Sequence, residues 1–210
     1  MTNIQQHHGS HDTLSGYIRA LIYRGGRSRA ALIALAVAMI VCHLAAFHSI
    51  DRFIVRISMQ QSGRGPPDLK VPDSRFGYTP AELHALYESY GSRGRRNYIW
   101  FEIFDYLVIM PVYFSLLSCS AAWLWQKLGF GESGLAIALP LIQVTSDLIE
   151  NFFQIYTAVC FQKIPGKSWL VGAMIASVFN RIKWVTFGLT ALELIILVVS
   201  LLFSIKKKTS

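Results

Sequence analysis

The sequence predicts an all-α, polytopic membrane protein with four transmembrane helices. Of its 210 residues, 53% are hydrophobic and only 15% are charged, whereas average soluble domains carry about 25% charged residues. The hydrophobic residues also stand in long blocks, and a helix that crosses a bilayer core needs about 20 mostly apolar residues. This composition argues against a soluble enzyme. It also excludes a disordered chain, which requires low hydrophobicity.

Residues 1–29 form a polar N-terminal tail that contains one amphipathic stretch. The apolar residues of this stretch recur at helical spacing: Leu14, Tyr17, Ile18, Leu21 and Ile22. With Arg19 and Arg24 beside them, they predict a helix that lies in the membrane interface. A solvated tail that happens to be amphipathic is the alternative.

Four apolar blocks follow, and together they define a transmembrane domain over residues 30–205. The predicted spans cover residues of about 30–50, 99–125, 134–160 and 184–205. The tryptophans lie near the ends of these spans, where aromatic side chains commonly sit at membrane interfaces: Trp100, Trp123, Trp125, Trp169 and Trp184. Residues 206–210 form a basic tail.

The long connection, residues 51–98, is predicted to contain one short helix over residues 80–90. Its start is marked by Thr79-Pro80-Ala81-Glu82, a capping box with proline at the first helical position. Gly91 is a plausible stop. Its apolar residues have helical spacing: Leu83, Leu86, Tyr87 and Tyr90. We expect this helix to lie on the membrane surface or to cover one end of the bundle.

Charged and amide side chains interrupt three of the apolar blocks. They form three groups: Glu102 and Asp105; Asp147, Glu150 and Asn151; and Arg181 with Lys183, just before Trp184. The first two groups have i, i+3 and i, i+4 spacing, so each lies on one helical face. Since a charge inside a bilayer costs several kcal/mol unless it is paired, we expect these groups to meet in one layer. Asp105, Asp147 and Glu150 should form its core, with at least one paired to Arg181 or Lys183.

This polar layer has two interpretations. In the first, ion pairs fix the order and register of the helices. In the second, the layer lines a water-accessible pocket that takes up a proton or binds a cationic or hydroxylated ligand. Glu193 is separate, because it lies in the middle of an apolar run without a basic residue at its depth. We expect it to be hydrogen-bonded across the bundle or to face a cavity.

Basic residues give the chain a net charge of +8. In a chain with these apolar blocks, the excess indicates basic flanks of membrane spans and favours lipid headgroups over nucleic acid as partners. The positive-inside rule does not decide the orientation, since both sides carry similar numbers of lysines and arginines. Lys207 and Lys208 stand fourth and third from the carboxyl end, which is similar to the dilysine signal that retains membrane proteins in the endoplasmic reticulum of eukaryotic cells.

Sequence patterns for enzymes and cofactors are absent. The chain contains no GxSxG, HExxH, Walker or GxGxxG motif. Three cysteines lie in or beside apolar segments and lack the spacing of a zinc site. We therefore expect neither a metal ion nor a cofactor.

Several short motifs resemble a group of small four-helix integral membrane proteins of unassigned function. The motifs are Phe76-Gly77-Tyr78-Thr79-Pro80, the Gly94-Arg95-Arg96-x-Tyr98 turn, Glu102-x-x-Asp105, Ser146-Asp147-Leu148-x-Glu150-Asn151 and Asn180-Arg181-x-Lys183-Trp184. This resemblance implies a topology and no activity. Asp105 followed by Pro111 is also similar to the emopamil-binding (EXPERA) group of sterol isomerases and ligand-binding proteins, although a histidine-containing catalytic pattern like theirs is not evident here.

These observations favour a non-enzymatic, multi-pass protein of an internal membrane that has a structural or partner-binding role. Its partners would be membrane lipids and another membrane protein or a second copy of the chain. A protein that binds or isomerises a sterol or another lipophilic ligand is the alternative. A small proton-coupled transporter is the third hypothesis.

Overall fold

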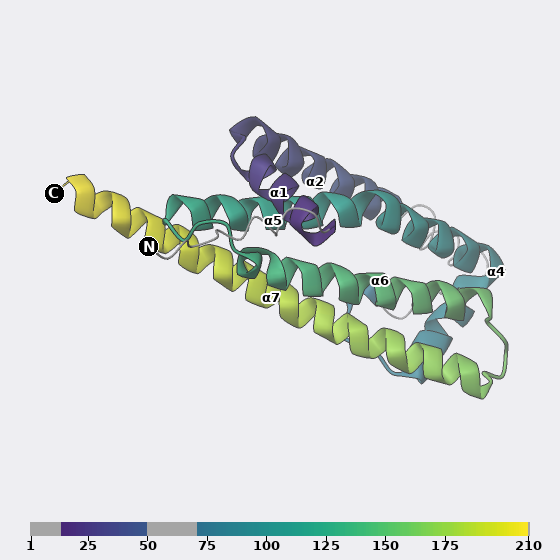
Figure 1. The fold of residues 1–210 in the computed structure, drawn as a ribbon. Helices are drawn as coiled ribbons and strands as arrows, with labels where there is room; N and C mark the ends of the chain where they lie inside the picture. The colour runs from purple at the N-terminus through teal and green to yellow at the C-terminus, as the bar shows by residue number, and fades with distance from the viewer. Residues whose placement is uncertain (1–13, 50–70, 210) are drawn as a thin grey trace.

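The computed structural model describes residues 14–49 and 71–209, and it is a bundle of long helices. Four helical segments in this part of the chain are long and apolar enough to cross a membrane: Arg29–His48, Pro80–Lys127, Gly134–Val159 and Lys167–Lys207. Figure 1 shows them running side by side along one long direction. The predicted all-α fold with four spans is confirmed.

The elements follow one another along the chain with short connections, apart from the segment between residues 49 and 72. Their bounds are α1 Leu14–Gly26, α2 Arg29–Ser49, the short 3₁₀ turn η2 Pro72–Ser74, α4 Pro80–Phe104, the π-helical turn η3 Asp105–Ile109, α5 Met110–Lys127, the 3₁₀ turn η4 Gly134–Ile137, α6 Ala138–Val159 and α7 Lys167–Thr209. The predicted tail over residues 1–13, much of the predicted loop 51–98 and Ser210 lie outside the described residues.

The N-terminal stretch forms a helix, α1, that packs on α5. Ile22 and Tyr23 are buried against Cys119 and Ala122 of α5. The Tyr23 hydroxyl donates to the carbonyl of Ser133 at 2.9 Å and accepts from its amide at 2.7 Å, and burial raises the pKa of Tyr23 above its usual value. Three residues of the predicted stripe stay exposed: Tyr17, Ile18 and Leu21. An apolar stripe turned away from the bundle is what an interfacial helix requires.

The predicted short helix begins where the capping box places it. The Thr79 side chain accepts from the amide of Glu82, and the Glu82 carboxylate accepts from the amide of Thr79. The four apolar positions are all buried: Leu83, Leu86, Tyr87 and Tyr90. They pack against the end of α6 and the start of α7, where Trp169 and Ala173 lie. This half of α4 therefore covers one end of the bundle.

The helix α4 is kinked at Gly91, and its second half follows the kink without a loop. Its backbone angles are φ 63° and ψ −179°, a region that only glycine occupies readily. Helical structure resumes directly and continues to Phe104. The predicted span, which starts at residue 99, therefore begins inside this helix. The kink lets one chain segment cover the bundle end and then enter the bundle.

A π-helical turn, η3, separates α4 from α5. The amide of Met110 donates to the carbonyl of Asp105, five residues back, and Pro111 follows, which lacks an amide hydrogen for the regular helical pattern. π-turns of this kind are frequent at functional sites. Here the turn holds Asp105 in the interior of the bundle, where it is 7% exposed.

The last helix, α7, contains the predicted span of residues 184–205 and extends well beyond its N-terminal end. It contains 43 residues, so at about 1.5 Å per residue it is about 65 Å long. It lies along α6, and its C-terminal end projects past the ends of α5 and α6 (Figure 1). Asn180 and Lys183 stand just before the predicted span of residues 184–205, but they do not mark the start of the helix. They are buried in the middle of the helix, where partners on other elements satisfy them.

We predict that Gly91→Ala destabilises the protein, because the native angles at Gly91 cost a residue with a side chain about 1–3 kcal/mol. The melting temperature in detergent, followed by the loss of the monodisperse peak in size-exclusion chromatography, measures this effect.

Gly188→Ala in α7 is the matched control, since Gly188 is helical and a Cβ there meets no atom within 4 Å. It should leave the melting temperature unchanged or raise it. Equal effects of the two substitutions would mean that the kink is not a constraint of the fold.

Candidate functional site

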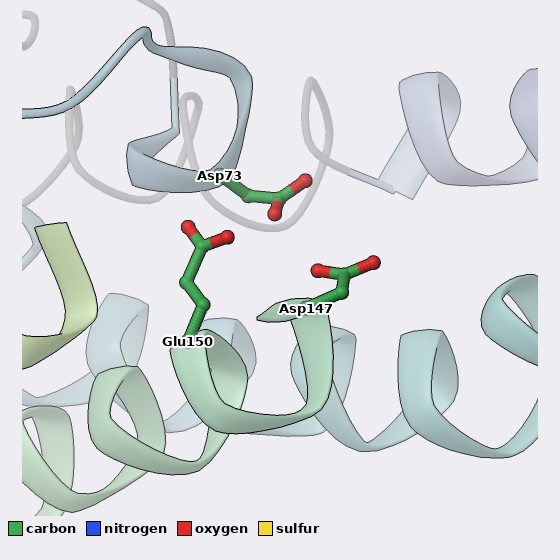
Figure 2. A group of neighbouring side chains, drawn as sticks. All are labelled: Asp73, Asp147 and Glu150. Atoms are coloured by element: carbon green, nitrogen blue, oxygen red, sulfur yellow. The ribbon is translucent and has the colours of Figure 1, made fainter. Parts of the chain in front are cut away.

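A buried lysine on α7 stands at the centre of the polar layer. The Lys183 ammonium lies 3.1 Å from an Asp147 carboxylate oxygen and 2.6 Å from one of Glu150. It also contacts the carboxylate of Asp73, which comes from the turn η2. We refer to these four residues as the Lys183 cluster. Figure 2 shows its acidic members, with Asp73 facing Asp147 and Glu150 from the opposite side.

Helix geometry explains why Asp147 and Glu150 share one cation. They are separated by one turn of α6, so their side chains leave the same face, and both are buried, at 4% and 0% exposure. Lys183 reaches that face from the neighbouring helix α7. The predicted pairing of Asp147 and Glu150 with a basic residue of the fourth helix is present in the structure.

Further hydrogen bonds reach the two α6 carboxylates of the cluster. The Asn180 amide donates to Glu150 at 2.7 Å, and the Gln154 amide donates to the same carboxylate oxygen. The Tyr113 hydroxyl of α5 donates to Asp147 at 2.7 Å. Since buried charges are tolerated when they are paired and hydrogen-bonded, this part of the layer is a well-satisfied polar core.

The segment from η2 to the start of α4 is docked on α7 by its own hydrogen bonds. The amide of Gly77 donates to the Asn180 side chain at 2.6 Å, and the amide of Tyr78 donates to Ser177 at 3.0 Å. The Trp184 indole donates to the carbonyl of Asp73 at 3.2 Å. These contacts place the Asp73 carboxylate beside the Lys183 ammonium. Asp73 is the member of the site that the sequence analysis missed.

Tyr78 links this segment to the same network. Its hydroxyl accepts from the Gln154 amide at 3.1 Å. Burial, and next the negative charge of Glu150, raise the pKa of Tyr78 well above its usual value. Tyr78 therefore remains a neutral hydroxyl beside the cluster at any physiological pH.

Arg181 does not join the layer, which corrects the expectation that it faces the carboxylates. Its side chain is exposed and lies over Gly77, where a Cβ would be 2.3 Å from the guanidinium Nε. The two residue steps from Arg181 to Lys183 turn the helix by about 200°, because each step turns it by about 100°. Since Lys183 points inward, Arg181 has to point outward.

Asp105 and Glu102 extend the layer along the second span. The Asn151 amide donates to Asp105 at 2.6 Å, one turn along α6 from Asp147. Glu102 is completely buried, and neither of its carboxylate oxygens has a hydrogen-bond partner among the described residues. All seven predicted residues except Arg181 are thus inside the bundle. Glu193, expected to bond across the bundle, accepts from the Trp125 indole at 3.2 Å.

The three carboxylates of the cluster are arranged as a cation site. Oxygen atoms of Asp73, Asp147 and Glu150 all lie within 4.8 Å of one another, and oxygen ligands of this kind suit Mg²⁺ or Ca²⁺. The Lys183 ammonium lies among these same oxygens. It therefore takes the position that a metal ion would occupy, and a metal ion would have to displace it.

A cavity of about 180 Å³ opens beside the cluster, between α2, α5, α6 and α7. Its polar lining is formed by His43, Asp73, Tyr113, Gln143, Asp147 and Lys183, and its apolar lining by Met39, Ile109, Trp184 and Phe187. Gln143 is only 4% exposed, yet its carbonyl oxygen has no hydrogen-bond partner within the described chain. The cavity therefore combines apolar walls with a free acceptor and one edge of an ion-paired cluster, a combination typical of small-molecule sites.

Searches of family models, curated proteins and solved structures find no match to this chain.

We predict that Lys183→Met lowers the free energy of unfolding by about 3–5 kcal/mol, because it leaves buried carboxylates without their cation. The melting temperature of the purified variant in detergent measures the loss.

Arg181→Met is the matched control, since it removes a basic residue of the same helix that lies outside the cluster. It should melt close to the wild-type protein. If Arg181→Met lost more stability than Lys183→Met, Arg181 and not Lys183 would be the residue of α7 that faces α6, and the account of the cluster would be wrong.

Proposed function

We propose that this multi-pass membrane protein binds a small lipid-soluble ligand in the cavity beside the Lys183 cluster. The observation that carries the proposal is Gln143. A buried acceptor without a partner costs about 1–3 kcal/mol, and Gln143 bears this cost at the wall of a cavity. A ligand that donates a hydrogen bond would remove it.

The lining supports a ligand with one polar head and an apolar body. The carbonyl of Gln143 and the carboxylate of Asp147 are acceptors, so the head should carry an O–H or N–H donor. The side chains of Met39, Ile109 and Phe187 would contact the apolar part. Phe187 is 43% exposed, which suits an opening toward the lipid. The function that this lining supports is therefore binding.

A structural role is the second candidate, and the closed pairing of Lys183 supports it. Three carboxylates surround one ammonium, and Asn180, Gln154 and Tyr113 complete their hydrogen bonds. A cluster of this kind fixes the register of α6 against α7 and does not require a ligand. The two roles differ at Gln143, which belongs to the cavity and not to the cluster. Proton-coupled transport stays a prediction.

We predict that Gln143→Leu abolishes retention of the ligand without lowering stability. The substitution removes an acceptor that has no partner among residues 14–49 and 71–209, so the melting temperature should stay the same or rise. Mass spectrometry of small molecules that remain bound after purification in lipid nanodiscs measures the loss.

Gln154→Leu provides the comparison on the same helix. Gln154 accepts from Tyr98 and donates to Tyr78 and Glu150, so this variant should lose stability. If Gln143→Leu also melts at a lower temperature and the set of retained molecules is unchanged, Gln143 is structural and the binding function fails.

An endoplasmic reticulum location is part of the proposal for a eukaryotic host, and it rests on Lys207 and Lys208. These residues lie in the last turn of α7.

We predict that replacing Lys207 and Lys208 by serine moves the protein toward the cell surface. Lys206→Ser is the control and should leave the distribution unchanged. Microscopy of a tagged chain measures both. Retention of the double variant would remove the argument for this location.

A further inference from the structure

A second cavity, of about 200 Å³, lies at the other end of α2 and has basic walls. It is lined by Arg27, Arg29, Trp123, Gln126 and Lys127. We propose that this cavity binds the phosphate group of an anionic phospholipid or of a free phosphate ester. The inference is independent of the ligand proposed for the Lys183 cluster.

The charges around this cavity are unbalanced. Arg27 pairs with Glu132 at 2.7 Å, and this exposed pair is only weakly stabilising. Arg29 and Lys127 have no carboxylate partner in the part of the chain that the structure describes. Three cations against one carboxylate leave two positive charges in excess. An anion is therefore the complementary ligand.

Neutral donors inside the cavity also favour an anion. The amide nitrogen of Gln126 is buried and has no hydrogen-bond partner among the described residues. The first turn of α2 begins at Arg29, where Ser28 caps the amide of Ala31 at 3.2 Å. The positive dipole end of this 21-residue helix also attracts phosphate groups. The unpartnered Gln126 donor and the start of α2 thus adjoin a cavity that already has excess positive charge.

Close packing of the α1–α2 turn on α5 fixes where the basic residues of this cavity lie. Gly26 lies directly on α5, because a Cβ at this position would be 2.7 Å from the carbonyl oxygen of Cys119 and 3.3 Å from the amide of Trp123. This contact places Arg27 and Arg29 beside the end of α5, where Gln126 and Lys127 lie.

The position of the cavity suits a lipid headgroup. Arg29 begins one candidate membrane span and Lys127 ends another, so both basic side chains stand where a span meets the interface. Trp123 is an aromatic residue of the type that is enriched at this depth. Basic pockets between transmembrane helices commonly bind phosphorylated headgroups.

The test is the melting temperature of the purified full-length protein in neutral detergent, titrated with short-chain phosphatidic acid, short-chain phosphatidylcholine or inorganic phosphate. We expect phosphatidic acid to stabilise the wild-type protein more than phosphatidylcholine does. The Arg29→Gln/Lys127→Gln variant should require a much higher concentration for the same shift, since each basic residue near an anionic surface contributes about fivefold in affinity. A shift by inorganic phosphate that is equally strong and equally lost in the variant would identify a free phosphate as the ligand.

Two further variants separate a built site from general charge attraction. Gln126→Leu keeps the net charge and should weaken the effect of phosphatidic acid. Arg93→Gln/Arg96→Gln removes two exposed charges of α4 and should leave it unchanged. Equal stabilisation of the wild-type protein and the Arg29→Gln/Lys127→Gln variant would overturn the proposal. The proposal would also be overturned if Arg93→Gln/Arg96→Gln lost all stabilisation by phosphatidic acid, or if Gln126→Leu were stabilised by phosphatidic acid as strongly as the wild-type protein.

Discussion

The fold depends on the burial of one ammonium group among three carboxylates. Lys183 cannot lie unpaired inside an apolar bundle, and neither can Asp147 or Glu150. Because Asp147 and Glu150 leave one face of α6, this requirement sets the rotation and the register of α7. It also brings in Asp73, so the segment that precedes α4 has to dock on α7. One electrostatic requirement therefore connects three parts of the chain that lie far apart in the sequence.

Polar groups outside that cluster are less well satisfied, and their positions are informative. In the part of the chain that the structure describes, the Gln143 carbonyl lacks a partner beside the cavity at the Lys183 cluster, and the Gln126 amide lacks one beside the cavity at Arg29. The first is an acceptor with carboxylates nearby, and the second is a donor with cations nearby. The first cavity is lined by His43 in the second half of α2, and the second by Arg29 at its start. The two cavities therefore favour different ligands, a hydrogen-bond donor at the first and an anion at the second.

The amino-acid pattern predicts local features well and long-range docking poorly. The four spans, the capping box at Thr79 and the shared face of Asp147 and Glu150 follow from length and periodicity, which act within one helix. Asp73 could not be predicted, because a carboxylate in an irregular turn has no period that says where it docks. Arg181 and Lys183 lie two residues apart, and their sequence does not say which one faces α6. Buried charges and charges at a span boundary also look alike in a sequence, so the burial of Lys183 within α7 becomes clear only when its partners are known.

The central claim is that Lys183 and the carboxylates of α6 hold the bundle through a direct interaction. A double-mutant cycle of Lys183→Met and Asp147→Asn, measured by unfolding in detergent, tests this most directly. The account predicts that the double variant is more stable than the sum of the two single losses implies, with a coupling free energy of about 1–3 kcal/mol. Strict additivity of the two losses would contradict it, because residues that do not interact contribute independently.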